Sequence, residues 1–113
     1  MQASADYRDG SLKLQLFGEL DHYSASTTLR IIESAIEEYL PRQCELDLCG
    51  LNFMDSSGIA VLLKTEGMMR QTGGGVIVTR ANEQIRRVVR LSGLGGMLRG
   101  EDKIKECETV HEC

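Results

Sequence analysis

The sequence predicts an α/β domain in which strands and helices alternate along the chain. Apolar and polar residues alternate in residues 12–16 and 44–48, which is typical of strands that bury one face. Between and after these segments, apolar residues recur at helical spacing, and the helical patterns end at Pro41 or at Gly73–Gly75. The expected order is β-β-α-β-α-β-α with a weak β-α tail, so most crossovers should be parallel and right-handed.

The first strands form a hairpin in this interpretation. Asp9-Gly10 is a favoured two-residue turn between residues 3–8 and the alternating segment. A long helix follows, with Ser24 as its N-cap and Pro41 as its end. Its inward positions repeat at helical spacing and are Leu29, Ile32, Ile36 and Leu40.

The next strand has charged residues, Glu45 and Asp47, on a face that we expect to be partly open to water. A loop over residues 50–54 should lead to a second helix over residues 56–72. The remaining expected elements are a strand over 76–79, a helix from Asn82 with Arg86, Arg87 and Arg90 outward, an edge strand over 97–99 and a short helix over 103–108.

Length and charge set limits on the class of protein. The 113 residues suit one domain, with a core over about residues 3–99 and an acidic tail over 100–113. The net charge of −4 disfavours nucleic acid as a direct partner. The apolar run of residues 59–63 is far shorter than the roughly 20 residues of a membrane span. Residues 1–10 lack the basic start and the apolar stretch that are typical of a signal peptide. We therefore expect a cytoplasmic protein without membrane contact.

The sequence gives little support for a metal site, a cofactor or catalysis. Cys107, His111 and Cys113 match no common zinc spacing, so no metal or cofactor is expected. Ser57 and His22 are residue types used in acyl transfer, but the G-x-S-x-G elbow is missing. Asp21 and His22 are also adjacent in the sequence, so we do not expect them to form a catalytic relay with Ser57. We therefore do not expect an enzyme.

Two segments stand out where a strand gives way to a helix: Gly18–His22 and Met54–Gly58. In open α/β sheets, ligand and partner sites gather at such strand ends. Ser57 falls in the first turn of a helix, where unpaired N–H groups and the helix dipole favour a phosphate. The alternative is that Asp55 or Ser56 simply caps the helix and that Ser57 has no role.

Three motifs resemble those of the STAS family, and specifically of the bacterial anti-sigma factor antagonists. They are G-E-L-D-H at Gly18–His22, F-M-D-S-S-G at Phe53–Gly58, and L-S-G-L at Leu91–Leu94. The resemblance spans about residues 6–94. It implies a STAS-like single domain whose mixed sheet carries helices mainly on one face. The chain departs from the family at Gly95–Gly96, where relatives carry a bulky residue, which puts the last strand in doubt.

The resemblance also implies a function. An antagonist of this kind binds an ATP-binding anti-sigma factor serine kinase and thereby releases a sigma factor. The kinase phosphorylates the antagonist on the second serine of D-S-S-G, here Ser57, and so rejects it. A PP2C-type phosphatase acting on phospho-Ser57 resets the cycle. The partner-binding residues implied by the motifs are Gly18, Asp21, His22, Asp55, Ser56 and Gly58, with Asp21 and Asp55 orienting the serine hydroxyl and contacting the partner.

One other role stays open. A STAS module can serve as a scaffold, or as a transport-associated subunit, without a phosphorylation cycle of its own. A basic stretch such as residues 80–99 is usually just a solvated face, and the alternative is a surface for an acidic partner.

Overall fold

The computed structural model describes residues 2–99. The expected acidic tail, its helix over 103–108 and the residues Cys107, His111 and Cys113 lie outside the described residues. The elements are β1 (Gln2–Arg8), β2 (Ser11–Leu20), α1 (Ala25–Tyr39), β3 (Gln43–Met54), α2 (Ser56–Gln71), β4 (Gly75–Thr79), α3 (Glu83–Leu91), a 3₁₀ turn (Gly95–Met97) and β5 (Leu98–Arg99).

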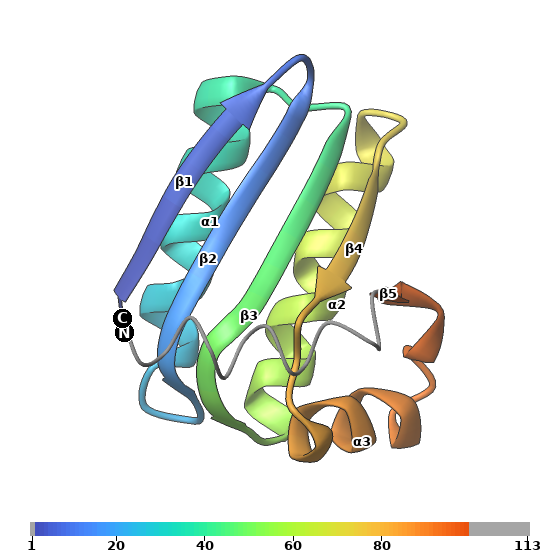
Figure 1. The fold of residues 1–113 in the computed structure, drawn as a ribbon. Helices are drawn as coiled ribbons and strands as arrows, with labels where there is room; N and C mark the ends of the chain where they lie inside the picture. Colours follow the sequence, from blue (N-terminus) through green and yellow to red (C-terminus); the bar gives the residue numbers. More distant parts are fainter. Residues whose placement is uncertain (1, 100–113) are drawn as a thin grey trace.

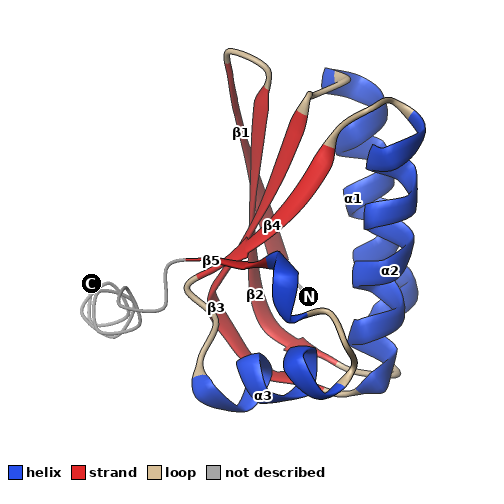
Figure 2. Ribbon diagram, turned by 90° about the vertical axis from the view of Figure 1, so that its right-hand side faces the viewer, coloured by secondary structure: helices blue, strands red, loops and turns tan. Residues whose placement is uncertain are grey.

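The five strands form one mixed sheet in the order β1-β2-β3-β4-β5 (Figure 1). β1 pairs antiparallel with β2, and the other neighbours are parallel. The parallel strands β2, β3 and β4 therefore end at the same edge of the sheet. Helices α1 and α2 cover one face, whereas α3 lies across that edge (Figure 2). The α/β fold class and the order of elements are confirmed.

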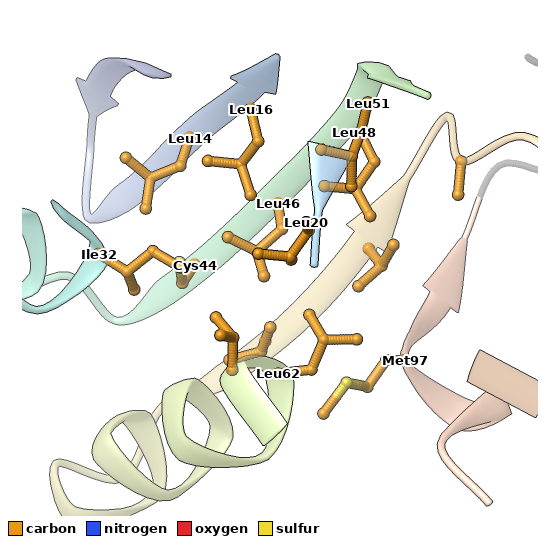
Figure 3. Packing of buried hydrophobic residues seen from close by; sticks show 14 of the residues in the cluster. Leu14, Leu16, Leu20, Ile32, Cys44, Leu46, Leu48, Leu51, Leu62 and Met97 are labelled. Carbon is orange, nitrogen blue, oxygen red and sulfur yellow. The ribbon is translucent and has the colours of Figure 1, made fainter. Parts of the chain in front are cut away.

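The core lies between the sheet and helices α1 and α2, and it follows from the predicted alternation. The apolar residues of β2 and β3 point toward the helices and meet Ile32 of α1 and Leu62 of α2 (Figure 3). Leu14 and Leu46 are both buried, as the strand pattern requires. The fully or almost fully buried leucines of these strands are Leu12, Leu14, Leu16, Leu20, Leu46, Leu48 and Leu51.

The opposite face of the sheet is less open to water than predicted, because Asp47 is buried. Its carboxylate accepts two hydrogen bonds from Arg80, at 3.2 and 2.7 Å, and a third from the Gln15 amide at 3.3 Å. Lys13 Nζ lies 3.6 Å away. A buried carboxylate is tolerated when it is paired and hydrogen-bonded in this way. The expectation of a solvated side chain is wrong at this position.

The predicted loop over residues 50–54 is also wrong, because β3 continues to Met54. These residues pair with the last residues of β2, for example Gly18 with Leu51 and Leu20 with Met54. Two register irregularities interrupt the alternation there and hide the strand pattern. Gly50 suggested a loop, but its missing side chain instead leaves room for the ring of Phe17.

Helix α3 differs from prediction at Arg86. This side chain is buried, although a position on the outer side of the helix was expected. Because α3 lies across the strand ends, more of its surface is covered, and the whole Arg86 side chain is buried, including the guanidinium group. A buried charge of this kind is tolerated when it is paired and hydrogen-bonded. Arg86 Nε lies 3.7 Å from Glu83 Oε1.

At the end of the described chain, the edge strand predicted over residues 97–99 begins one residue later than expected, at Leu98.

Candidate functional site

The turn between β2 and α1 is held by hydrogen bonds among its own residues. Asp21 Oδ1 accepts the main-chain N–H groups of Tyr23 and Ser24, at 3.0 and 3.1 Å. Ser24 Oγ accepts the Asp21 N–H at 3.1 Å and donates to the Glu19 carbonyl at 2.7 Å. Aspartate favours such turns because its short side chain reaches the backbone two residues ahead. In the structure, the carboxylate of Asp21 therefore shapes the turn.

The start of α2 is capped by Asp55. Its Oδ1 accepts the main-chain N–H of Ser57 at 2.8 Å, and its carbonyl accepts those of Gly58 and Ile59 at 3.0 and 3.3 Å. The prediction of unpaired N–H groups at Ser57 is thus wrong, because the preceding aspartate takes the donor. Capping and a role for Ser57 do not exclude each other, since the cap uses only the main chain of Ser57.

The two motifs meet at Leu20, the last residue of β2. Its carbonyl accepts the Asp55 N–H at 3.3 Å. A Cβ on Gly58 would lie 3.1 Å from that carbonyl oxygen and would clash with Met54. Glycine is therefore required at position 58 for α2 to approach the end of β2 so closely. This contact fixes the position of Ser57 relative to the β2–α1 turn.

Ser57 and His22 line one groove between α1 and α2, with a volume of about 280 Å³. Ser57 is half-buried, whereas Ser56 and His22 are exposed. Tyr23 beside them is 90% exposed and packs edge-on against the His22 ring. The full lining is His22, Ala25, Ser26, Leu29, Ser57, Ala60, Val61 and Lys64. The groove thus brings together two residues that are 35 positions apart in the sequence.

One predicted site residue lies elsewhere than expected. Gly18 belongs to β2 and not to the turn, and its positive φ of 107° marks the irregularity in the pairing with β3. Glycine adopts such a φ without strain. The strand continues through the exposed Glu19 to Leu20, so the turn begins only at Asp21.

Sequence reasoning missed Lys64, which lines the groove from the middle of α2. The available signal was its spacing, because residues 57 and 64 lie two helical turns apart on one side of a helix. It also missed Gln84 of α3, whose amide donates to the Met54 carbonyl at 2.9 Å and accepts the Met54 N–H at 3.2 Å. This pair of bonds ties α3 to the end of β3, and no sequence pattern indicates it.

The groove offers a hydroxyl, an imidazole and an ammonium group, but not the geometry of a catalytic relay. The hydrogen bonds of the Asp21 carboxylate go to main-chain N–H groups of its own turn. Within residues 2–99, no group of three or more metal-ligating side chains comes together. The same residues contain no helix that is both long and apolar enough to cross a membrane. The site thus presents the half-buried Ser57 together with the exposed His22 and Lys64 on one surface.

The fold and the site define a small α/β domain. Helix α2 begins at the carboxyl ends of the parallel strands, and Ser57 lies in its first turn. The family model for the STAS domain matches residues 2–112, and the chain belongs to this family.

Similar proteins include the anti-sigma F factor antagonist of Paenibacillus polymyxa, which is 36% identical over 97 residues, covering 83% of this chain and 80% of that protein. The structure of the anti-sigma factor antagonist SpoIIAA in its unphosphorylated form matches with a TM-score of 0.78 and 24% identity, over 99% of this chain and 98% of that one. The phosphorylated form of the Bacillus cell fate determinant SpoIIAA matches with a TM-score of 0.70 and 24% identity, over 96% and 99%. At this identity the two structures show a shared fold.

Proposed function

We propose that this chain is an anti-sigma factor antagonist that is switched off by phosphorylation of Ser57. In its unphosphorylated form it binds an anti-sigma factor that is also an ATP-dependent serine kinase, and the sigma factor is released. A PP2C-type phosphatase removes the phosphate and restores binding. The chain acts in the cytoplasm and is itself no enzyme.

One observation carries the proposal: the two motif segments form a single surface. The contact of Asp55 and Gly58 with Leu20 places Ser57 beside the β2–α1 turn, and His22 and Ser57 line the same groove. A partner that covers the turn must therefore also cover the serine. The similarity to antagonists of anti-sigma factors supports this partner class.

The chemistry is a phosphoryl transfer performed by the partner. Ser57 Oγ attacks the γ-phosphorus of ATP, the bond between that phosphorus and the leaving oxygen of ADP breaks, and the hydroxyl proton passes to a base of the kinase. The phosphate adds about −1.5 to −2 charges near neutral pH. At about 6 Å from one partner carboxylate, the repulsion is about 1 kcal/mol in water-like surroundings and about 5 kcal/mol at an effective dielectric constant near 20. Affinity should therefore fall roughly tenfold to several-thousandfold.

The test uses the full chain and its cognate anti-sigma kinase with ATP. Mass spectrometry identifies the modified residue, and titration of both forms against the ADP-loaded kinase measures the affinities. We expect one phosphate on Ser57 and weaker binding of the modified form. Ser57→Ala should bind and stay bound, and Ser57→Asp should bind weakly.

Ser56→Ala is the matched control, because Ser56 is the exposed neighbour in the same helical turn. It should still be phosphorylated on Ser57, and its modified form should bind more weakly than its own unmodified form. Modification at Ser56 alone, or equal affinity of the two forms, would contradict the switch. Binding without any modification would instead favour a STAS scaffold or a transport-associated subunit.

A further inference from the structure

The groove beside Ser57 contains one lysine that the switch described above does not use. Lys64 follows Ser57 by seven residues on α2 and lines the same groove. Seven residues make almost two helical turns, so both side chains point to the same side, with a rise of about 10.5 Å between them. Helical side chains lean toward the N-terminus, which directs Lys64 toward Ser57.

A phosphate on Ser57 would meet few donors in its own helical turn. The Ser57 N–H is bonded to the Asp55 carboxylate, and the N–H groups of Gly58 and Ile59 are bonded to the Asp55 carbonyl. The carboxylate of Asp55 is moreover a negative charge next to the modified residue. A compensating positive charge must therefore come from elsewhere in the groove.

Two groove residues can supply that charge. Lys64 is exposed and forms no ion pair within the described part of the chain. His22 lines the groove from the β2–α1 turn. Lysine binds phosphate as a flexible point charge, and its long stem can extend from its own turn along the groove toward the first turn of α2. Lys64 is thus the cation placed to respond to a phosphate in this groove.

We propose that Lys64 is the intramolecular counter-ion of phosphorylated Ser57. This inference rests on the proposed phosphorylation of that serine. The ion pair forms only in the modified state, so it stabilises the phosphorylated domain and offsets the repulsion from Asp55. Part of the added charge is then neutralised inside the domain, so the charge repulsion of the partner is weaker than the full charge of the phosphate would give.

The test places phosphoserine at position 57 by genetic encoding, so that no kinase is needed. Phosphorus NMR then follows the second ionisation of the phosphate between about pH 4 and pH 8, since its pKa is ordinarily about 6. A lysine ammonium about 5 Å away favours the dianion and should lower this pKa by about half a unit. The negative charge of Asp55 opposes the effect.

The Lys64→Gln variant should raise the phosphate pKa by about half a unit, and Lys64→Arg should keep it at the wild-type value. Arg30→Gln removes an equal charge from an exposed residue that lines a different groove on α1, and it should change nothing. Thermal melts check that each variant is folded. An identical titration in wild type and Lys64→Gln would overturn the proposal.

The two proposals fail in different experiments. If the kinase leaves Ser57 unmodified, the proposed function fails, whereas the encoded phosphoserine still reports on Lys64. If Lys64→Gln has no effect on the phosphate, the counter-ion is disproved and the kinase cycle at Ser57 stands.

Discussion

At the scale of single residues, Asp47 shows how the sheet tolerates a charge in its interior. Burial alone would raise the pKa of this carboxyl group. Hydrogen bonds from Arg80, the Cys49 N–H and Gln15, together with the charge of Arg80, outweigh burial and hold the pKa below its ordinary value. The carboxylate thus joins β2, β3 and the end of β4 on the face opposite to α1 and α2.

The lowered pKa makes a testable contribution to stability. The folded state binds the Asp47 proton less tightly than the unfolded chain does, so the contribution is present above about pH 4 and is lost as the pH falls through the folded pKa. At pH 7, Asp47→Asn should lower the free energy of unfolding by about 1–3 kcal/mol, because Arg80 loses its charged partner. Urea melts at pH 7 and near pH 3 should show this difference shrinking in acid. A difference independent of pH would refute the role of the charge.

At the scale of elements, the start of α2 depends on its cap. Asp55 accepts the Ser57 N–H, and Asn82 accepts the Ile85 N–H at 2.9 Å at the start of α3. Both helices thus begin with a side-chain cap, but only the cap of α2 lies next to the groove. This allows the effect of a cap on stability to be separated from its effect on binding.

Asp55→Ala and Asn82→Ala should each cost about 0.5–2 kcal/mol of stability. Denaturant melts measure this cost. Only Asp55→Ala should also weaken binding to the anti-sigma kinase, since the first turn of α2 then loses its fixed geometry. Asp55→Ser, which keeps a capping oxygen, should recover most of the stability. Equal loss of binding in Asn82→Ala would show that binding follows overall stability and not the cap.

The elements differ in how well the sequence predicts them. The strands over residues 12–16 and 44–48 were predictable because apolar and polar residues alternate along both segments. The extension of β3 to Met54 was not, because a change of register between β2 and β3 breaks the alternation. The burial of Arg86 depends on α3 lying across the strand ends, and this placement comes from tertiary contacts such as the bonds between Gln84 and Met54.

The candidate site shows the same division. The segment containing Ser57 could be located from its place between a strand and a helix and from the family motifs. The sequence predicted only that the segments containing His22 and Ser57 both lie at strand ends. That the two side chains line one groove, and that Lys64 lines it with them, was not predicted. Side chains that meet across two helices leave no periodic trace in the sequence, so their contact becomes visible only in the fold.

At the scale of the whole molecule, one core supports both the sheet and the site. Leu46 is 0% exposed in the central strand β3, between the sheet and the helices. Leu46→Ala should therefore cost about 2–5 kcal/mol through the cavity it leaves. Leu63→Ala is a matched control on α2, where the side chain is 49% exposed, and it should cost less than about 0.5 kcal/mol. Urea melts distinguish the two, and a small effect at Leu46 would contradict its place in the core.

The close approach of Gly58 to the Leu20 carbonyl has a consequence for how STAS domains of this kind can diversify. The serine is positioned by main-chain atoms and by a glycine, and not by the side chains that face a partner. Substitutions of His22, Tyr23 or Lys64 would therefore change the surface of the groove while the main chain at Ser57 keeps its place. Because the surface and the support of the serine are separate in this way, the domain is a suitable scaffold for engineering variants that differ only in their partner.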